Sequence, residues 1–205
     1  MKLYYAPHTC ALSPHILLHE LGLPFELERV DLRSKRTETG QDYATINPKG
    51  YVPTLELDDG SRLTEGPAIS QYLGDQVPER GLVPPAGSRE RYELQSWLNF
   101  ISCEVHKPFG ALFGSLPEEQ KEAQRAKIIQ RLDWVESELE RRPWLVGDQY
   151  GAADIYLFVI TGWADGFGLD TRHWPHLREW RARIAERPAV KAAIAEEEAR
   201  VEEKV

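Results

Sequence analysis

The sequence predicts an α/β domain followed by an all-helical domain. In residues 1–80, short runs with strand character alternate with helix-like runs, which is the pattern of a βαβ unit and its extensions. Residues 78–88 shift toward Pro and Gly, as linkers do. Beyond them the strand pattern disappears and apolar residues recur at helical spacing. We therefore place one domain at 1–80, a linker at 81–88 and a helical domain at 89–205.

The first domain is expected to contain short strands joined by helices and turns. Strands with apolar residues are expected at 3–5, 25–32, 54–57 and 62–64. The last two form a hairpin, because Gly60 in the turn Asp58-Asp59-Gly60 accepts a positive φ. Helices are expected at 13–21, ended by Gly22, and at 67–73, ended by Gly74.

The second domain is expected to be entirely helical. Two amphipathic stripes carry this prediction, each with apolar residues three or four positions apart: Leu94, Trp97, Ile101 and Val105, and then Ile128, Leu132, Val135 and Leu139. Further helices are expected at 152–164 and 177–185. Asp154 stands three residues after the helix-capping Gly151, so its carboxylate has a structural role at the cap amide. The charged tail at 196–204 is interpreted as a solvated helix end.

Charge and composition exclude several classes of partner. The 205 residues include 33 acidic and 25 basic side chains, a net charge of -8, and no Lys/Arg block, so no nucleic-acid partner is expected. No apolar run approaches the roughly 20 residues of a membrane span, and the start lacks the apolar region of a signal peptide. We therefore expect a cytoplasmic protein without a membrane partner. The two cysteines have no metal-type pairing and cannot form a multi-bridge framework.

Cys10 is the first candidate for chemistry, because it lies between the first strand and the first helix. Ser13 is expected to cap that helix and Pro14 to occupy its first turn. The partial positive charge of a helix N-terminus would then favour the reactive thiolate. The spacing Cys10-x-x-Ser13 resembles a redox motif without its second cysteine, so an external thiol would be needed. The alternative is a small apolar side chain behind the first turn.

Two further features flank this position. Tyr5, at the end of the first strand, could donate a phenolic hydrogen bond to the thiolate, although core packing is the commoner fate of such a residue. In Val52-Pro53, the proline removes a ladder donor and permits a cis peptide, which leaves the preceding backbone free to pair with an extended ligand. An ordinary proline at the start of a strand is the alternative.

A site for a zwitterion is expected at the start of the second helix. Gly66 is its expected N-cap and Pro67 follows, so free backbone amides could take a carboxylate while Glu65 takes an ammonium. A simple helix cap is the alternative. Lys35 and Lys49 could add local positive charge, although each alone resembles a surface lysine.

Polar residues also share one stripe of the first helix in the second domain. Asn99, Cys103 and His106 recur four and three residues apart, flanked by Glu104 and Lys107. We interpret them as a polar wall facing a cleft, and the alternative is a solvated face with Cys103 in the core.

One pair of histidines has the spacing of metal ligands. His15 and His19 stand one helical turn apart, but no third ligand is evident, so no metal site is predicted.

Taken together, these features resemble the glutathione transferases, especially the bacterial Beta class. The order and spacing of many short motifs carry the resemblance across nearly the whole chain: 2–5, Cys10 with 13–15, 47–50, Val52-Pro53, 63–66, 97–100, 104–107, 153–158 and 185–188. The resemblance implies a thioredoxin-like N-terminal domain, a helical C-terminal domain, a homodimer, and glutathione as co-substrate without another cofactor. Two positions depart from the family pattern: Ala11, where many members have Ser, and Gly151, where a Ser or Thr cap is usual.

The resemblance also implies roles for individual residues. Cys10, with Tyr5 and His106 as further candidate catalytic residues, would approach the glutathione sulfur and form a mixed disulfide, while the Val52 backbone pairs with the tripeptide before a cis-Pro53. Glu65 and Gly66 would hold the γ-glutamyl end and Lys35 the glycine carboxylate. The pocket would be completed by residues of the helical domain: Asn99, Cys103, Glu104, Val105 and His106.

The sequence is compatible with three functions. The leading hypothesis is detoxifying conjugation, in which glutathione thiolate attacks a small hydrophobic electrophile. The second is thiol–disulfide exchange, in which a second glutathione resolves a mixed disulfide on Cys10. The third is a non-enzymatic carrier of hydrophobic molecules, suggested by aromatic residues of the helical half: Trp97, Phe109, Phe113, Trp163 and Phe167.

Overall fold

The computed structural model describes residues 1–202 and divides the chain into two compact units. One comprises Met1–Arg80 together with the chain from Arg187 onward, and the other is Gly81–Glu186. The first contains a five-stranded sheet with helices, and the second contains only helices and turns. The predicted fold class, a thioredoxin-like domain with a helical domain, is confirmed.

The sheet of the first unit has the strand order β3-β2-β1-β4-β5. Strand β1 (Lys2–Tyr5) lies at its centre, parallel to β2 (Glu26–Asp31) and antiparallel to β4 (Thr54–Glu56). Strand β5 (Arg62–Thr64) pairs with β4, and β3 (Arg36–Thr37) forms the other edge. The four predicted strands are present. Strand β3 was not predicted, because two residues are too short to show an apolar pattern.

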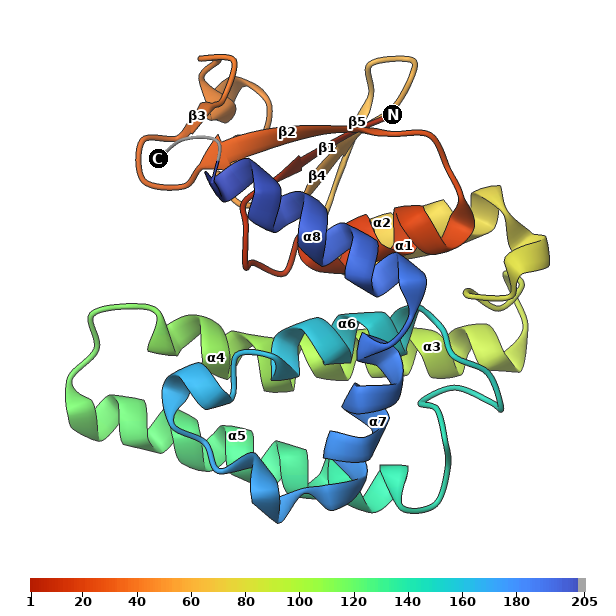
Figure 1. The fold of residues 1–205 in the computed structure, drawn as a ribbon, viewed down its shortest axis with the longest axis vertical. Coiled ribbons are helices and arrows are strands. Elements are labelled where there is room, and N and C mark those ends of the chain that lie inside the picture. Colours follow the sequence, from red (N-terminus) through yellow and green to blue (C-terminus); the bar gives the residue numbers. More distant parts are fainter. Residues whose placement is uncertain (203–205) are drawn as a thin grey trace. The chain divides into compact units, whose positions relative to one another are not determined.

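Three helices lie on one face of this sheet: α1 (Leu12–Leu21), α2 (Gly66–Gln76) and α8 (Pro188–Glu202). Figure 1 shows α8 alongside α1. The short 3₁₀ turns of this unit are Tyr43–Thr45 and Pro78–Arg80.

The ends of two helices differ from the prediction. Helix α1 is capped by Ala11 rather than Ser13. Pro14 still fits the first turn, because no N–H in that turn has an intrahelical acceptor. At the other end Gly22, with a φ of 68°, closes the helix as expected. Helix α2 continues through Gly74, which shows that one interior glycine, at a cost of about 1 kcal/mol, does not stop a packed helix.

The predicted domain boundary fails for the last helix. Residues 89–205 were assigned to the helical domain, but α8 packs against α1 in the first unit. The interpretation of its acidic residues as a solvated end is wrong for Glu197, which is only 3% exposed. The remainder of the tail, 203–205, lies outside the described residues. Periodicity identifies a helix, but it does not identify the surface on which a helix packs.

Helices form the second unit, as predicted, with one irregular turn. The elements in chain order are α3 (Arg89–Phe100), a π-helical turn (Ile101–His106), α4 (Lys107–Leu112), α5 (Glu118–Leu139), α6 (Ala152–Thr161) and α7 (Pro175–Ala185), with 3₁₀ turns at Asp165–Phe167 and Thr171–His173. Sequence spacing did not predict the π-helical turn, which shifts the phase of every side chain that follows it.

The cap of α6 confirms the role predicted for Asp154. This buried carboxylate accepts hydrogen bonds from the Gly151 amide at 3.0 Å, the Leu145 amide at 3.1 Å and the Trp180 indole at 3.1 Å. A Cβ at position 151 would lie 2.8 Å from the carbonyl oxygen of Leu82. Close backbone approach therefore accounts for glycine at this cap, where the family pattern has Ser or Thr.

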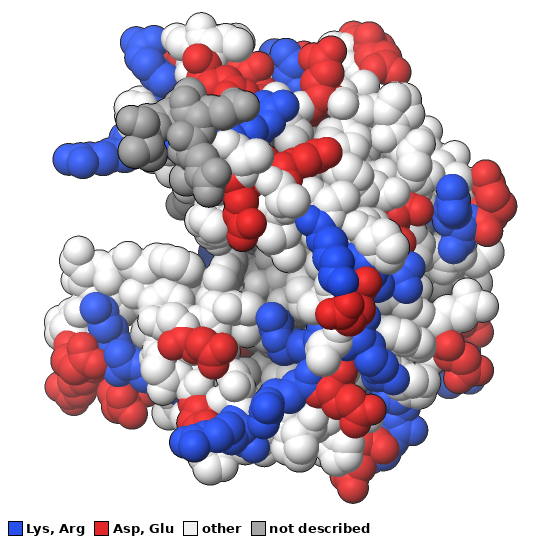
Figure 2. Space-filling view, viewed as in Figure 1, with Lys and Arg blue, Asp and Glu red and all other residues white. Residues whose placement is uncertain are grey.

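Surface charge agrees with the mixed composition. On the face shown in Figure 2, Lys and Arg side chains are interspersed with Asp and Glu. Among the described helices, none combines the length and the apolar character needed to cross a bilayer.

Candidate functional site

Cys10 lies in the loop between β1 and α1, as predicted, and contacts a second predicted segment. Its thiol donates a hydrogen bond to the Val52 carbonyl oxygen, with Sγ 3.6 Å from that oxygen. The Val52–Pro53 peptide bond is cis. Because Pro53 has no N–H and both residues are part of one short loop before β4, the chain at this point is not a regular ladder strand. The two segments, 42 residues apart in sequence, form one locus.

The ionisation predicted for Cys10 is wrong in this structure. Burial raises the pKa of the Cys10 thiol to about 12, against the lowering effect of its own backbone N–H, and Glu65 raises the pKa further. The amides expected to stabilise a thiolate have other acceptors. Ala11 N–H donates to the Thr9 hydroxyl, and Leu12 and Ser13 N–H donate to the carbonyls of Thr9 and Cys10. Cys10 is therefore a neutral thiol at pH 7 and a hydrogen-bond donor.

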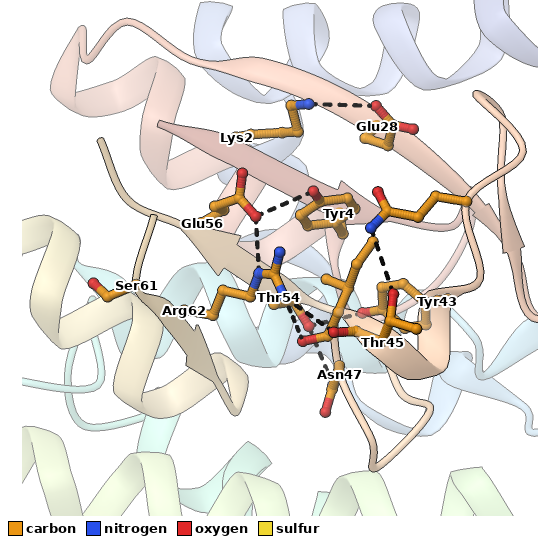
Figure 3. Close-up of polar contacts among 12 residues, drawn as sticks. Lys2, Tyr4, Glu28, Tyr43, Thr45, Asn47, Thr54, Glu56, Ser61 and Arg62 are labelled. Carbon is orange, nitrogen blue, oxygen red and sulfur yellow. Dashed lines mark hydrogen bonds and ion pairs between the residues drawn. The ribbon is translucent and has the colours of Figure 1, made fainter. Parts of the chain in front are cut away.

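A closed hydrogen-bond network, which no sequence pattern predicted, fixes the loop that carries Val52. The Tyr43 hydroxyl donates to the Tyr51 carbonyl at 2.9 Å and lies 2.7 Å from the Thr54 hydroxyl. The Asn47 amide donates to the same carbonyl at 2.8 Å and to Thr54 at 3.1 Å. Thr54 can then donate to Tyr43, so every member has a partner. Figure 3 shows Tyr43, Asn47 and Thr54 converging below the sheet residue Tyr4.

Lys35 lies at the other end of the same loop. Its Nζ donates to the Gly50 carbonyl at 2.9 Å, so the segment from Gly50 to Val52 runs between the Lys35 ammonium and the Cys10 thiol. The backbone of Lys35 has a φ of 57°. Non-glycine residues adopt such values rarely, and often at functional sites.

Glu65 also has a left-handed backbone, with a φ of 71°. It precedes Gly66, the first residue of α2, whose N–H no earlier helical turn can accept. Glu65, rather than Gly66, is the N-cap. Its exposed carboxylate accepts from Lys49 Nζ at 2.7 Å, and Lys49 also donates to the Thr64 hydroxyl at 2.9 Å. A carboxylate, a cation and the Gly66 amide therefore lie together at the start of α2, whereas the amides of Ala68 and Ile69 already donate to the Glu65 carbonyl. Binding of a zwitterion here stays a prediction.

Tyr5 does not have the role predicted for it. Its side chain is fully buried, and its hydroxyl has no hydrogen-bond partner among the described residues, so the predicted bond to Cys10 is absent. Burial raises the pKa of Tyr5 to about 12. Side chains of successive strand residues point to opposite faces, and the charges that act on Tyr5 include Arg200 and Glu197 of α8. Tyr5 is a core residue on the helix-covered face of the sheet.

Of the residues predicted to form a polar wall in the second unit, only some are exposed. Asn99, Cys103 and Glu104 are exposed, but Val105 is fully buried, so this residue is closed to a ligand that approaches from solvent. Glu104 pairs with Arg131 at 2.7 Å. Cys103 is a free, exposed thiol, which overturns the alternative that it fills the core. The contribution of these residues to glutathione binding stays a prediction.

His106, predicted as catalytic, faces inside its own unit. Its Nδ1 lies 2.7 Å from the Tyr156 hydroxyl, and its ring contacts Trp163. Burial, with a smaller effect of Lys107, lowers the pKa of His106 to about 4. The ring is therefore neutral at pH 7. If Tyr156 donates to Nδ1, the proton is on Nε2, which makes His106 a hydrogen-bond donor rather than a cation.

Comparison with known proteins agrees with this fold. Residues 9–76 match the family model described as the glutathione S-transferase N-terminal domain, and residues 100–188 match the C-terminal domain model. Glutathione S-transferase GstA of Escherichia coli O157:H7 is 46% identical over 198 residues, which are 96% of this chain and 98% of that protein. Glutathione S-transferase GST-4.5 of Xanthomonas campestris is 36% identical, covering 95% and 97% of the two chains.

Solved structures give the same result. BphK, a bacterial glutathione transferase solved as a ternary complex, superposes with a TM-score of 0.95 at 54% identity, covering 96% of this chain and 99% of its own. A sphingomonad glutathione S-transferase solved with glutathione gives 0.94 at 44% identity, covering 96% and 98%. The Beta-class enzyme of Sphingomonas chungbukensis gives 0.94 at 43%, with the same coverage.

The two matching domains define a two-domain, glutathione-dependent class of protein. This chain belongs to the glutathione S-transferase family, and its relatives include Beta-class members. The resemblance inferred from the short motifs is confirmed. The chain is a transferase, and glutathione is the co-substrate of its family.

The raised pKa of Cys10 predicts a difference in reactivity between the two thiols. At pH 7.5, iodoacetamide should alkylate the exposed Cys103 at least about 100-fold faster than Cys10, because only a thiolate attacks the reagent. Peptide mass spectrometry over time measures both rates, and Cys103→Ser isolates the slower one. Equal rates would show that Cys10 is ionised near neutral pH.

The network around Tyr43 predicts a linked loss of stability and binding. In Tyr43→Phe, the Tyr51 carbonyl loses one donor and the Thr54 hydroxyl loses its acceptor, so the free energy of unfolding should fall by about 1–3 kcal/mol. The dissociation constant for glutathione should rise, since the loop before Pro53 is less firmly held. Tyr92→Phe, at an exposed position, is the matched control. Unchanged stability and affinity in Tyr43→Phe would contradict the role of the network.

The lowered pKa of His106 predicts a component of acid sensitivity. The unfolded chain takes up a proton near pH 6.5, but the folded chain does so only near pH 4, so stability falls as the pH drops through this window. Between pH 8 and pH 5, His106 alone lowers the free energy of unfolding by about 2 kcal/mol. His106→Gln should lose less stability over that range in denaturant titrations, whereas the exposed His173→Gln should behave as wild type. An identical loss in His106→Gln would refute the assignment.

Proposed function

We propose that this glutathione transferase conjugates glutathione thiolate to small hydrophobic electrophiles, with the neutral Cys10 thiol acting as a hydrogen-bond donor to the glutathione sulfur. The observation that carries the proposal is the Cys10 thiol, neutral and directed at the Val52 carbonyl 3.6 Å away. A ligand sulfur that replaces that carbonyl as acceptor would receive a hydrogen bond stronger than one between neutral groups.

The three parts of glutathione match three features of the first unit. The glycine carboxylate suits Lys35, whose ammonium lies at one end of the 50–52 segment. The cysteinyl backbone suits the Val52 main chain ahead of Pro53. The γ-glutamyl end carries both charges and suits Glu65 together with the first amide of α2 at Gly66. The ammonium of the ligand would share the Glu65 carboxylate with Lys49 or displace it.

Conjugation then needs no ionised protein sulfur. Glutathione binds and loses its thiol proton to solvent, and its sulfur anion is held by the Cys10 S–H. The sulfur lone pair forms a bond to the electrophilic carbon, and the carbon releases its leaving group or passes its electron pair to an acceptor that is then protonated. Cys10 keeps its proton throughout. The raised pKa of Cys10, which would impair a nucleophile, suits a donor.

Thiol–disulfide exchange through Cys10 is the weaker alternative. A mixed disulfide requires the Cys10 thiolate to attack, and a pKa of about 12 leaves very little thiolate at pH 7. The predicted mixed disulfide would need bound glutathione or an oxidant to change this environment.

An aromatic cluster in the second unit supports a hydrophobic co-substrate. Phe113 is 62% exposed, and its ring contacts Trp163 and Phe167 at centroid distances of 5.3 and 4.8 Å. Phe109 packs beneath them and is fully buried. Binding of apolar ligands without turnover would instead favour the carrier hypothesis.

We further propose a cytoplasmic homodimer that uses no other cofactor and has neither nucleic acid nor membrane as a partner.

A set of variants tests this assignment. Cys10→Ser, which keeps a donor, should retain conjugation within a few-fold across a panel of electrophiles, while Cys10→Ala should lose about 10-fold, the value of one charge-assisted hydrogen bond. Glu65→Gln should weaken glutathione binding by about 10-fold in calorimetry. Glu26→Gln, at an exposed position on β2, is its matched control.

Two outcomes would overturn the proposal. Wild-type protein that neither binds immobilised glutathione nor conjugates any electrophile of the panel would exclude conjugation. Full conjugation in Cys10→Ala would exclude the donor role of Cys10. Exchange activity that is present in wild type and disappears in Cys10→Ala would establish the alternative reaction.

A further inference from the structure

Helices α1 and α8 bring together two histidines and a glutamate outside the glutathione site. The His15 Nε2 and the His19 Nε2 lie 2.9 Å and 3.2 Å from the same oxygen, Glu196 Oε2. All three atoms lie within 4.8 Å of one another. The one-turn spacing of the histidines is visible in the sequence, but the third ligand is not, because α8 supplies it from more than 170 residues away.

The two ring nitrogens of the buried His15 face different glutamates. Its Nδ1 lies 3.3 Å from Glu197 Oε1, while its Nε2 faces Glu196. A neutral imidazole has one N–H and cannot donate to both carboxylates. With a cation at Nε2, the proton on Nδ1 is free to donate to Glu197, which is the carboxylate–histidine–metal arrangement of many zinc proteins. Glu197 is itself held by the His8 amide at 3.2 Å.

We propose that His15, His19 and Glu196 form a binding site for a divalent zinc ion, with a fourth position open to solvent. Tetrahedral zinc with bonds of about 2.0–2.1 Å separates its ligands by about 3.4 Å. The observed separations of 2.9 and 3.2 Å are shorter by about half an ångström or less, a change that side-chain rotation supplies. Two imidazoles and one carboxylate suit zinc, whereas calcium and magnesium prefer oxygen ligands.

The cluster is open to solvent on one side and packed against buried side chains on the other. The side chains of Glu196 and His19 are 45% and 21% exposed, so the ion can reach the ligands from solvent. His15 is fully buried. Phe25 packs edge-on against both imidazole rings, at centroid distances of 5.5 and 5.1 Å. The apolar ring limits water on that side and fixes the imidazole planes.

Zinc at this position would join α8 to the helix that follows Cys10. The ligands come from both helices, so the ion would bind the folded chain much better than the unfolded chain and would raise its melting temperature. The inference concerns only the first unit and does not depend on the proposed conjugation reaction.

Calorimetry with zinc chloride tests the site on the full-length chain. Protein stripped with EDTA, with the exposed Cys103 thiol blocked by iodoacetamide, should bind about one zinc ion per chain at pH 7.5 in a non-chelating buffer. His19→Gln and Glu196→Gln should each weaken binding by at least about 10-fold. The matched controls are His173→Gln and Glu198→Gln, which change an exposed histidine and an exposed glutamate outside the cluster and should bind as wild type.

Two further measurements separate a metal site from a purely structural cluster. Cobalt(II) should give the intense visible absorption of a tetrahedral complex in wild type and in the controls, but not in His19→Gln. Zinc should raise the melting temperature of the same proteins, and circular dichroism verifies that each variant is folded. Absence of zinc binding in wild type, or equal zinc affinity in His19→Gln and the controls, would overturn the proposal.

Discussion

The position of the Tyr51 carbonyl is the constraint on which the candidate glutathione site depends. It accepts two hydrogen bonds, from the buried Tyr43 hydroxyl and Asn47 amide, and so fixes the chain one residue before Val52. A chain segment outside a regular strand has no ladder to hold it, and the buried network takes that place. Cys10 on one side and Lys35 on the other then meet carbonyls of a rigid loop.

The same network links the site to the sheet. Thr54 begins β4 and pairs with Tyr4 of the central strand, while its hydroxyl belongs to the network. Arg62 of β5 donates to the Thr45 carbonyl and to Glu56, and Glu56 accepts from Tyr4 (Figure 3). The 3₁₀ turn at Tyr43–Thr45 is therefore tied to the sheet at both ends. Polar groups that are fully paired in a core permit few alternative arrangements. The network therefore holds the backbone of the loop in one conformation.

Much of this arrangement could be predicted from local sequence patterns. Cys10, Val52-Pro53 and Glu65-Gly66 each stand at an element boundary that spacing and turn chemistry reveal. The ionisation of Cys10 was mispredicted, because a helix N-terminus suggests a free positive field, whereas Thr9 accepts two of the first amides and burial dominates. The network was missed since Tyr43 and Asn47 acquire their roles only through a carbonyl whose position the sequence does not show.

Helix α8 shows why some clusters of side chains cannot be predicted from local sequence patterns. Its acidic run, Glu196-Glu197-Glu198, has the composition of a solvated end. Only the return of the chain to α1 buries Glu197 and brings the exposed Glu196 to the histidines. Arg187, at the start of that return, forms a bidentate pair with Glu20 of α1, and Arg200 bonds to the β2 carbonyl of Leu27. These contacts fix both ends of α8 and so set which of its glutamates face His15. A long-range contact of this kind, and not the local charge pattern, decides whether an acidic residue is solvated or becomes a ligand.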